Sequence, residues 1–278
     1  MKLSICSQCT ALSVMFLSFA SSATLTVYAQ DKVIAGPKIL TIQREFTKPG
    51  KEGAAHEKSE AAFVKAMADA KATDHYYALT SLSGRPRVLF LSTYPSFAEI
   101  EAERKKVNAN ASLSAELDRA NEADGDLLAE TNSSMWMRRD DMSLNQGYRV
   151  GARYEELTQF VVRPGHMGEW TELVKLVIDA YKKGVPDAHW GTYELVYGGG
   201  GTFLVITTLR SGEEIDSNFA KDPKFIEALG PEGLKKLDAL EAACVESRQS
   251  NLFRIAPKMS YPPDQLVQAE PEFWTPKP

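Results

Sequence analysis

The chain has 278 residues, of which 44% are hydrophobic and 25% are charged. This composition is typical of a soluble globular protein and excludes collagen-like, disordered and membrane-embedded chains. The formal net charge of −5 argues against nucleic acid or an anionic membrane surface as the main partner, because either would require a basic patch.

The first 29 residues have the pattern of a secretory signal peptide. Lys2 makes a positive start, residues 11–20 form an apolar run, and Val27-Tyr28-Ala29 suits a cleavage site. The apolar run is shorter than a transmembrane helix requires. We therefore expect residues 1–29 to be removed and the mature protein to be periplasmic or secreted, without membrane contact. An uncut membrane anchor and cleavage after Ala23 are the alternatives.

Cleavage would leave a single cysteine, Cys244, because Cys6 and Cys9 lie in the signal segment. One cysteine cannot form an internal disulfide, so it is either buried or available for an intermolecular bond. Cys244 ends a stretch in which apolar residues recur at helical spacing, which favours burial on the apolar face of a helix.

The strongest pattern is an internal repeat. Residues 46–100 align without a gap with residues 161–215, at a constant offset of 115, and ten positions are identical. The Pro-Gly turn that begins at Pro49 aligns in this way with the turn that begins at Pro164. A repeat of this kind indicates that one folding unit occurs twice in the chain.

Each copy predicts the same series of elements, because β-branched and apolar runs indicate strands and apolar residues at helical spacing indicate helices. In the first copy we expect a strand at 39–46, a helix at 62–70, strands at 76–82 and 88–93, helical segments at 97–106 and 113–128, and a strand at 135–138. In the second copy the same order is expected at 157–162, 170–181, 190–197, 203–209, 222–244 and 251–255.

The resulting β-α-β-β-α-β order is that of a ferredoxin-like module. We therefore expect a first module at residues 38–145 and a second at 153–260. The last segment, 261–278, is rich in proline and lacks periodicity, so it is expected to be an extended tail that lies on the body through Phe273 and Trp274.

A strand that ends in Lys/Arg-Pro-Gly, followed by an amphipathic helix, an aromatic-rich strand, a turn and an apolar strand, resembles the antibiotic-biosynthesis-monooxygenase type of dimeric α/β barrel. The resemblance is clearest in residues 157–229 and weaker in 40–105. It implies an α+β fold in which two tandem ferredoxin-like modules pack as an intramolecular dimeric-type barrel, as in the two-module chlorite-dismutase-like proteins. The superfamily includes cofactor-free oxygenases, haem-degrading enzymes, haem peroxidases and isomerases, so the fold does not define the function.

Local catalytic and metal motifs are missing from the sequence. The segment from His56 to Glu60 lacks a second histidine, so we expect an exposed helix face there and no metal site. The Asn, Trp and His of the haem-degrading relatives cannot be placed, and Asn121 to Gly125 lacks the first glycine of a Gly-x-x-Asp-Gly motif. We therefore predict no cofactor, with haem as the minority alternative.

Two histidines and several aromatic residues are candidates for a binding site. His75 and His189 stand near the start of the second strand of each copy, where each could serve as a proton donor or haem ligand or be an ordinary loop-edge residue. The aromatic candidates on strands expected to border the barrel interior are Tyr77, Trp136, Trp190 and Tyr193.

Polar residues on apolar strand faces are further candidates. Arg44 shares its face with Leu40 and Ile42, and Gln159 is its counterpart in the second copy. The alternative for Arg44 is core packing with the charged end reaching toward water.

Together these residues predict an exported α/β-barrel protein that binds a small apolar or aromatic ligand in the barrel, between sheet and helices. Arg44, Gln159, Tyr77 and Tyr193 would orient the ligand. A cofactor-independent monooxygenase, a haem-binding protein and a non-catalytic interaction module are the alternatives, and whether the protein is an enzyme is left open. No nucleic-acid partner is expected, and the protein is expected to be a monomer or a homodimer.

Overall fold

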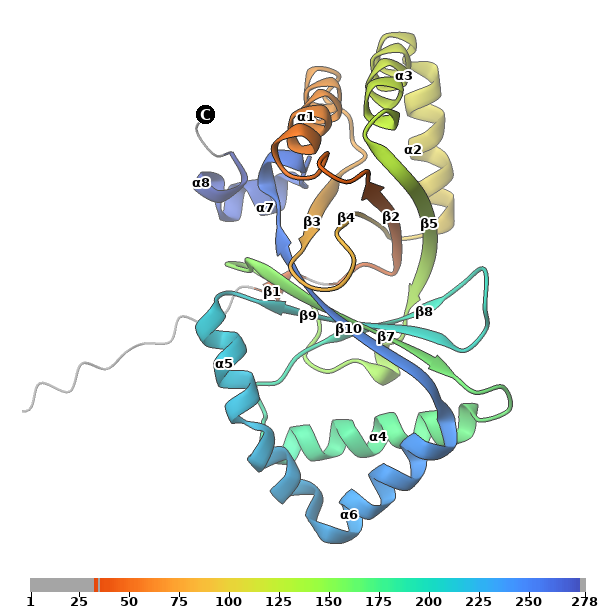
Figure 1. Cartoon of the computed structure of the whole chain (residues 1–278), viewed down its shortest axis with the longest axis vertical. Coiled ribbons are helices and arrows are strands. Elements are labelled where there is room, and N and C mark those ends of the chain that lie inside the picture. Colours follow the sequence, from red (N-terminus) through yellow and green to blue (C-terminus); the bar gives the residue numbers. More distant parts are fainter. Residues whose placement is uncertain (1–32, 35, 276–278) are drawn as a thin grey trace, which may run out of the picture. The chain divides into compact units, whose positions relative to one another are not determined.

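A computed structural model describes residues 33–34 and 36–275 (Figure 1). The predicted signal segment, with Cys6 and Cys9, lies outside these residues. No helix among the described residues is both long enough and apolar enough to cross a membrane.

The same element order occurs in the two halves of the chain. The first half contains β2 (Ile39–Thr47), α1 (Ala54–Asp69), β3 (Tyr76–Ser81), β4 (Val88–Tyr94), α2 (Phe97–Ala109), α3 (Ala111–Gly125) and β5 (Leu128–Arg138). The second half contains β7 (Tyr154–Val162), α4 (Met167–Gly184), β8 (Gly191–Leu195), β9 (Thr202–Leu209), α5 (Gly212–Ala220), α6 (Asp222–Cys244) and β10 (Val245–Ile255). Shorter elements are β1 (Val33–Ile34), η1 (Asp140–Met142), β6 (Tyr148–Arg149), η2 (Pro257–Met259), α7 (Asp264–Ala269) and α8 (Pro271–Trp274).

Within the described residues, eight antiparallel strands close into a barrel in the order β10-β3-β4-β2-β5-β8-β9-β7. Each half contributes four adjacent strands in the ferredoxin-like order of fourth, first, third and second. The halves join where β5 pairs with β8 and where β10 pairs with β3. Helices α1–α3 lie on the side of the first four strands and α4–α6 on the side of the second four (Figure 1).

Strand alternation divides the side chains between two environments. On β2, Leu40 and Ile42 point into the barrel, whereas Glu45 points toward α1. The barrel interior is filled by a core from both halves that includes Leu79, Leu91, Trp136, Leu157, Tyr193, Leu204 and Phe253. Most of the space between the two sheets is therefore packed solid.

Two serines that align at the offset of 115 residues have the same structural role. Ser96 and Ser211 begin α2 and α5 in the same way, because the hydroxyl of each accepts a hydrogen bond of 3.2 Å from the backbone N–H three residues later, at Glu99 and Glu214. Such caps satisfy donors that the first turn of a helix leaves unpaired.

Two local expectations differ from the structure. The final strands begin at Leu128 and Val245, earlier than expected. The sequence pattern did not indicate these starts because the five residues that follow each of them are exposed, mostly polar and without alternation. The helix at 222–244 is kinked where Gly230 has a φ of 65° and Pro231 follows. Cys244 is fully buried, as expected.

The C-terminal segment packs against one end of the barrel. It contains the short helices α7 and α8, so the expectation of an extended tail is wrong. Trp274 is buried with the barrel core, and the guanidinium of Arg153 lies 3.9 Å from the centre of the Phe273 ring. Contact through both aromatic residues is therefore confirmed.

Candidate functional site

A pocket with a volume of about 340 Å³ lies between the second sheet and its helices. We call it the helix-side cavity. Its walls come from β7, β8, β9, β10, α4, α5 and α6, and the aromatic residues that border it are Phe160, Trp170, Tyr181, Trp190 and Phe219.

Local sequence patterns explain why these side chains meet. On β7, alternate residues Glu156, Thr158 and Phe160 point toward the helices, and the residues between them face the barrel. On α4, Trp170 and Tyr181 lie on an apolar stripe that faces the sheet. The rings of Tyr181 and Trp190 contact edge to face at 5.2 Å.

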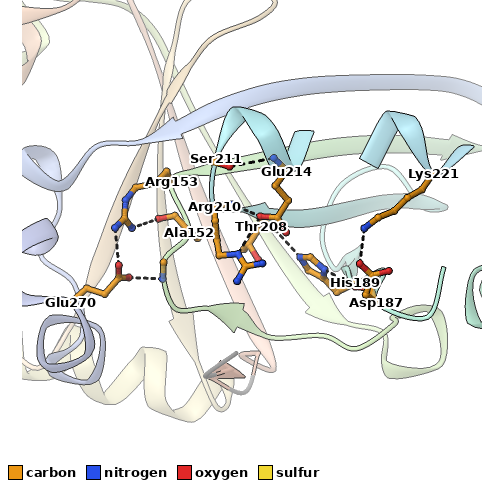
Figure 2. Close-up of polar contacts among 11 residues, drawn as sticks. Ala152, Arg153, Asp187, His189, Thr208, Arg210, Ser211, Glu214, Lys221 and Glu270 are labelled. Atoms are coloured by element: carbon orange, nitrogen blue, oxygen red, sulfur yellow. Dashed lines mark hydrogen bonds and ion pairs between the residues drawn. The ribbon is translucent and has the colours of Figure 1, made fainter. Parts of the chain in front are cut away.

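Polar groups also border the cavity, and one of them is unpaired. The indole N–H of Trp170 is buried and has no hydrogen-bond partner among the described residues. The guanidinium of Arg248 borders the cavity and lies 5.4 Å from the centre of the Phe160 ring. At another part of the wall, Lys221 Nζ lies 2.6 Å from Asp187 Oδ2 (Figure 2).

Two predicted candidates, His189 and Trp190, border this cavity. His189 Nε2 lies 2.8 Å from the carbonyl oxygen of Thr208, and Nδ1 lies 3.4 Å from that of Asp187 (Figure 2). Burial lowers the pKa of His189, so the ring is neutral near pH 7. The indole N–H of Trp190 donates to the carbonyl oxygen of Met142 at 3.0 Å.

The residues around the helix-side cavity do not fit a haem. A haem iron requires an axial ligand such as a histidine nitrogen or a tyrosinate. Each ring nitrogen of His189 faces a backbone carbonyl oxygen, and burial together with the charge of Asp222 raises the pKa of Tyr181, which disfavours the tyrosinate. Neither His189 nor Tyr181 therefore suits the role of axial haem ligand.

A smaller pocket of about 130 Å³ lies at one end of the barrel, and we call it the barrel-end pocket. It brings together the predicted candidates Tyr77 and Tyr193 with Tyr148 and Glu155. The Tyr77 hydroxyl donates to Glu155 Oε1 at 3.1 Å, whereas Glu155 Oε2 has no partner among the described residues.

The electrostatics of the barrel-end pocket suit proton transfer. Burial raises the pKa of Glu155 to about 8, even though the hydrogen bond from Tyr77 acts in the opposite direction. A carboxyl group that titrates near neutral pH can accept or donate a proton at little cost. Glu155 is therefore a candidate acid–base group.

The other four predicted candidates border neither pocket. Arg44 donates to Ser134 Oγ at 2.8 Å, and the indole N–H of Trp136 donates to the same oxygen at 2.7 Å. Gln159 lies in the middle of β7, and His75 stacks on Tyr261. The structure thus distributes the eight candidates over several places instead of joining them in one site.

A buried polar cluster lies under the helices of the first half. His56 is 1% exposed and contacts Glu45, Glu60 and Asp124, so the expectation of an exposed helix face is wrong. Burial alone would lower the pKa of His56, but the hydrogen bonds and charges of the three carboxylates outweigh it and raise the pKa to about 9. Burial raises the pKa of Glu60 to about 7 and also raises that of Asp124.

Alignment of the two copies contains a signal for two acidic residues that were not among the predicted candidates. At 115 residues, Glu155 corresponds to Leu40, and Glu45 corresponds to Phe160. A carboxylate that takes the place of a core residue in the sister copy is an informative difference, because buried charges are rare without a partner or a function. The contacts of Asp124 had no such signal.

No protein-family model matches the sequence, and no curated protein matches it. Several solved structures have a similar fold. A candidate monooxygenase from Fusobacterium nucleatum subsp. nucleatum has a TM-score of 0.52 at 11% identity, with 80% of this chain and 94% of that chain covered.

Two further structures are similar at lower scores. An anthrone oxidase-like protein has a TM-score of 0.49 at 13% identity and covers 79% of this chain and 92% of its own. A mutant chlorite dismutase from Candidatus Nitrospira defluvii has a TM-score of 0.48 at 9% identity and covers 84% of this chain and 96% of its own. The Fusobacterium likeness and the strand order show the dimeric α/β-barrel fold, as the resemblance implied.

Proposed function

We propose that this protein binds a small aromatic molecule in the helix-side cavity. The observation that carries the proposal is a space of about 340 Å³ bordered by five aromatic residues, of which Trp170 has a buried indole N–H without a hydrogen-bond partner among the described residues. Ligand pockets have volumes of roughly 300–1,000 Å³, so this space suits a molecule of one or two rings.

The chemistry of the walls indicates the class of ligand. The rings of Tyr181 and Trp190 offer flat surfaces to a planar molecule. The indole N–H of Trp170 can donate to one oxygen of the ligand, and this bond would satisfy a buried donor. Arg248 can donate a hydrogen bond to a ligand oxygen. A phenol, quinol or quinone has all of these features.

Binding can be measured through quenching of tryptophan fluorescence with a naphthol and a naphthoquinone as probes. Trp170→Phe keeps a ring but removes the donor, so we expect about tenfold weaker binding. Val177→Phe fills part of the cavity and should abolish binding. Tyr197→Phe changes an exposed aromatic residue of the same half and serves as the control. Equal affinity in Val177→Phe and the parent protein would contradict the proposal.

A cofactor-independent monooxygenase is the second candidate. The observation that favours it is Glu155, a buried carboxyl group with a pKa of about 8 that accepts a hydrogen bond from Tyr77. Such a group can remove a proton from a quinol-type substrate, which becomes more electron-rich and more reactive toward dioxygen. The similar Fusobacterium structure is described as a monooxygenase candidate, which agrees with this class of activity.

Oxygen uptake with quinol substrates tests this candidate. Glu155→Gln should abolish uptake, and Tyr77→Phe should reduce it less. The control is Glu156→Gln, because the next residue along β7 points into the helix-side cavity. Loss of oxygen uptake in Glu156→Gln but not in Glu155→Gln would place the reaction in the helix-side cavity. Oxygen uptake that neither substitution affects would exclude both sites.

The proposed binding protein is exported and consists of two copies of one module, residues 38–145 and 153–260. Export is supported by the signal-like segment 1–29, and duplication by ten identities at one offset and by equal strand orders in the two halves. N-terminal sequencing of the protein from the periplasm or medium tests export. A first residue near position 30 or 24 would support it, and an intact Met1 would contradict it.

A further inference from the structure

The cluster under the first-half helices consists of four side chains from three elements. Glu45 comes from β2, His56 and Glu60 from successive turns of α1, and Asp124 from the end of α3. All four are at least 95% buried. One possible ligand atom from each lies within 4.8 Å of the ligand atoms of the other three.

The protein by itself leaves this cluster incomplete. His56 Nε2 can donate one hydrogen bond, and its nearest acceptor is Glu45 Oε2 at 3.0 Å. Glu60 Oε1 and Asp124 Oδ1 lie 3.5 Å and 3.7 Å from the same nitrogen and have no hydrogen-bond donor among the described residues. Buried carboxylate oxygens without partners are destabilising, so both atoms indicate a missing cationic ligand.

Neighbouring polar groups do not neutralise the negative charge of the three carboxylates. Gln43 donates to Glu45 Oε1 at 2.7 Å, and Ser59 is a hydrogen-bond partner of Asp124. Both are neutral, so His56 remains the cationic partner that the three carboxylates share. A divalent cation would neutralise more of this charge than one imidazolium can.

We propose that Glu45, His56, Glu60 and Asp124 bind one divalent first-row metal ion, for which Mn²⁺ is the best match. Carboxylate oxygens suit Mn²⁺, and an imidazole nitrogen binds ions of this row. Two donors on one ion at about 2.1 Å lie at most about 4.2 Å apart, so small side-chain movements would bring these atoms into range. Because the site is closed, the ion would hold α1 and α3 on the sheet and would not act on a substrate.

The second half lacks this set of ligands, which fixes the expected stoichiometry. At the repeat offset Glu45, His56 and Glu60 correspond to Phe160, Thr171 and Lys175. We therefore expect one ion per chain, located in the first half.

The test uses the full-length protein after removal of metal with a chelator. Added Mn²⁺ is followed by the EPR signal of the free ion, and bound metal is counted by elemental analysis after gel filtration. We expect one tightly bound Mn²⁺ per chain and a rise in melting temperature that grows with free Mn²⁺. A folded parent protein that retains no Mn²⁺, Fe²⁺ or Zn²⁺ would overturn the proposal.

Variants assign the ion to these residues. Glu60→Gln and Asp124→Asn keep the shape of the side chain and should each weaken binding by at least about tenfold. Glu57→Gln changes an exposed carboxylate on the same helix and should bind as the parent does. His56→Gln should also remove the imidazole nitrogen modulation from the spectrum of bound Mn²⁺. Circular dichroism checks folding, and parental affinity in both Glu60→Gln and Asp124→Asn would overturn the assignment.

Discussion

The spaces under the helices of the two halves have the same surrounding elements and different contents. Under α1 and α3 lies the buried cluster around His56, whereas under α4–α6 lies a cavity with aromatic walls. A few corresponding positions account for much of this difference. Phe160 occupies the position that corresponds to Glu45, and Trp170 the position that corresponds to Ala55. Two rings in the second half therefore stand where the first half has a carboxylate and a methyl group.

This comparison teaches that the backbone arrangement does not determine what the space contains. A strand residue that points toward the helices can be a charged ligand or an apolar wall, because both occupy the same pleat position. The charged space is closed, and its four side chains are at least 95% buried. The aromatic space remains partly hollow, because large rigid rings leave gaps at their edges. Function is therefore expected to differ between the halves.

The largest expected effect concerns a buried aromatic residue of the helix-side cavity. Trp170 is 3% exposed and its ring contacts Phe160 and Phe203 at 5.2 Å and 5.0 Å. Trp170→Ala should lower the free energy of unfolding by about 3–5 kcal/mol, because it removes a buried ring and leaves a larger cavity. Tyr197→Ala, on an exposed residue, should change it by less than about 0.5 kcal/mol. Denaturant unfolding of the two variants measures the difference, and equal effects would contradict this role of Trp170.

A second prediction extends the comparison into the barrel, where Leu40 corresponds to Glu155. Burial raises the pKa of Glu155 to about 8 from a usual value of 4.5. The folded protein therefore binds this proton more tightly than the unfolded chain, and the free energy of unfolding falls as the pH rises from about 4.5 to about 8. We expect ionisation of Glu155 to lower the free energy of unfolding by about 3 kcal/mol over this range. This is less than the full pKa shift implies, because relaxation of the folded protein around the charge reduces the cost of ionisation.

Glu155→Gln should remove that part of the pH dependence, and urea unfolding between pH 5 and pH 8.5 (about the interval in which the group titrates) is the measurement. The hydroxyl groups that face Glu155 do not titrate there, because burial keeps the pKa of Tyr77, Tyr148 and Tyr193 above its usual value. Parallel pH curves for parent and variant would show that Glu155 is ionised in the folded state at no cost.

The smallest expected effect concerns an ion pair at the cavity wall. Lys221 pairs with Asp187, whose side chain is 66% exposed. Lys221→Ala should change the free energy of unfolding by about 0.5 kcal/mol or less, and added salt should reduce the difference. A larger, salt-independent loss would mean that this pair fixes the first turn of α6.

Much of the fold was accessible from the sequence, because strand alternation and helical periodicity depend on neighbouring residues. The pattern of Leu40, Ile42 and Arg44 on one face of β2 is found in the structure. The candidate site was less accessible. His189 and Trp190 were among the predicted candidates for the binding site. Trp170 and Glu155 were not, because the residues that surround them in the two pockets come from distant strands and helices.

The sequence by itself predicted the repeat, and it determined the order of strands and helices and the two faces of each strand, since these follow from local spacing. The tertiary structure alone decided which buried faces remain hollow and which carboxylates meet. It placed Asp124 against His56, 68 positions away along the chain, and left the indole N–H of Trp170 without a hydrogen-bond partner among the described residues. Such contacts depend on how α3 and α4 pack on their sheets, and packing sums over many weak interactions that no local pattern records.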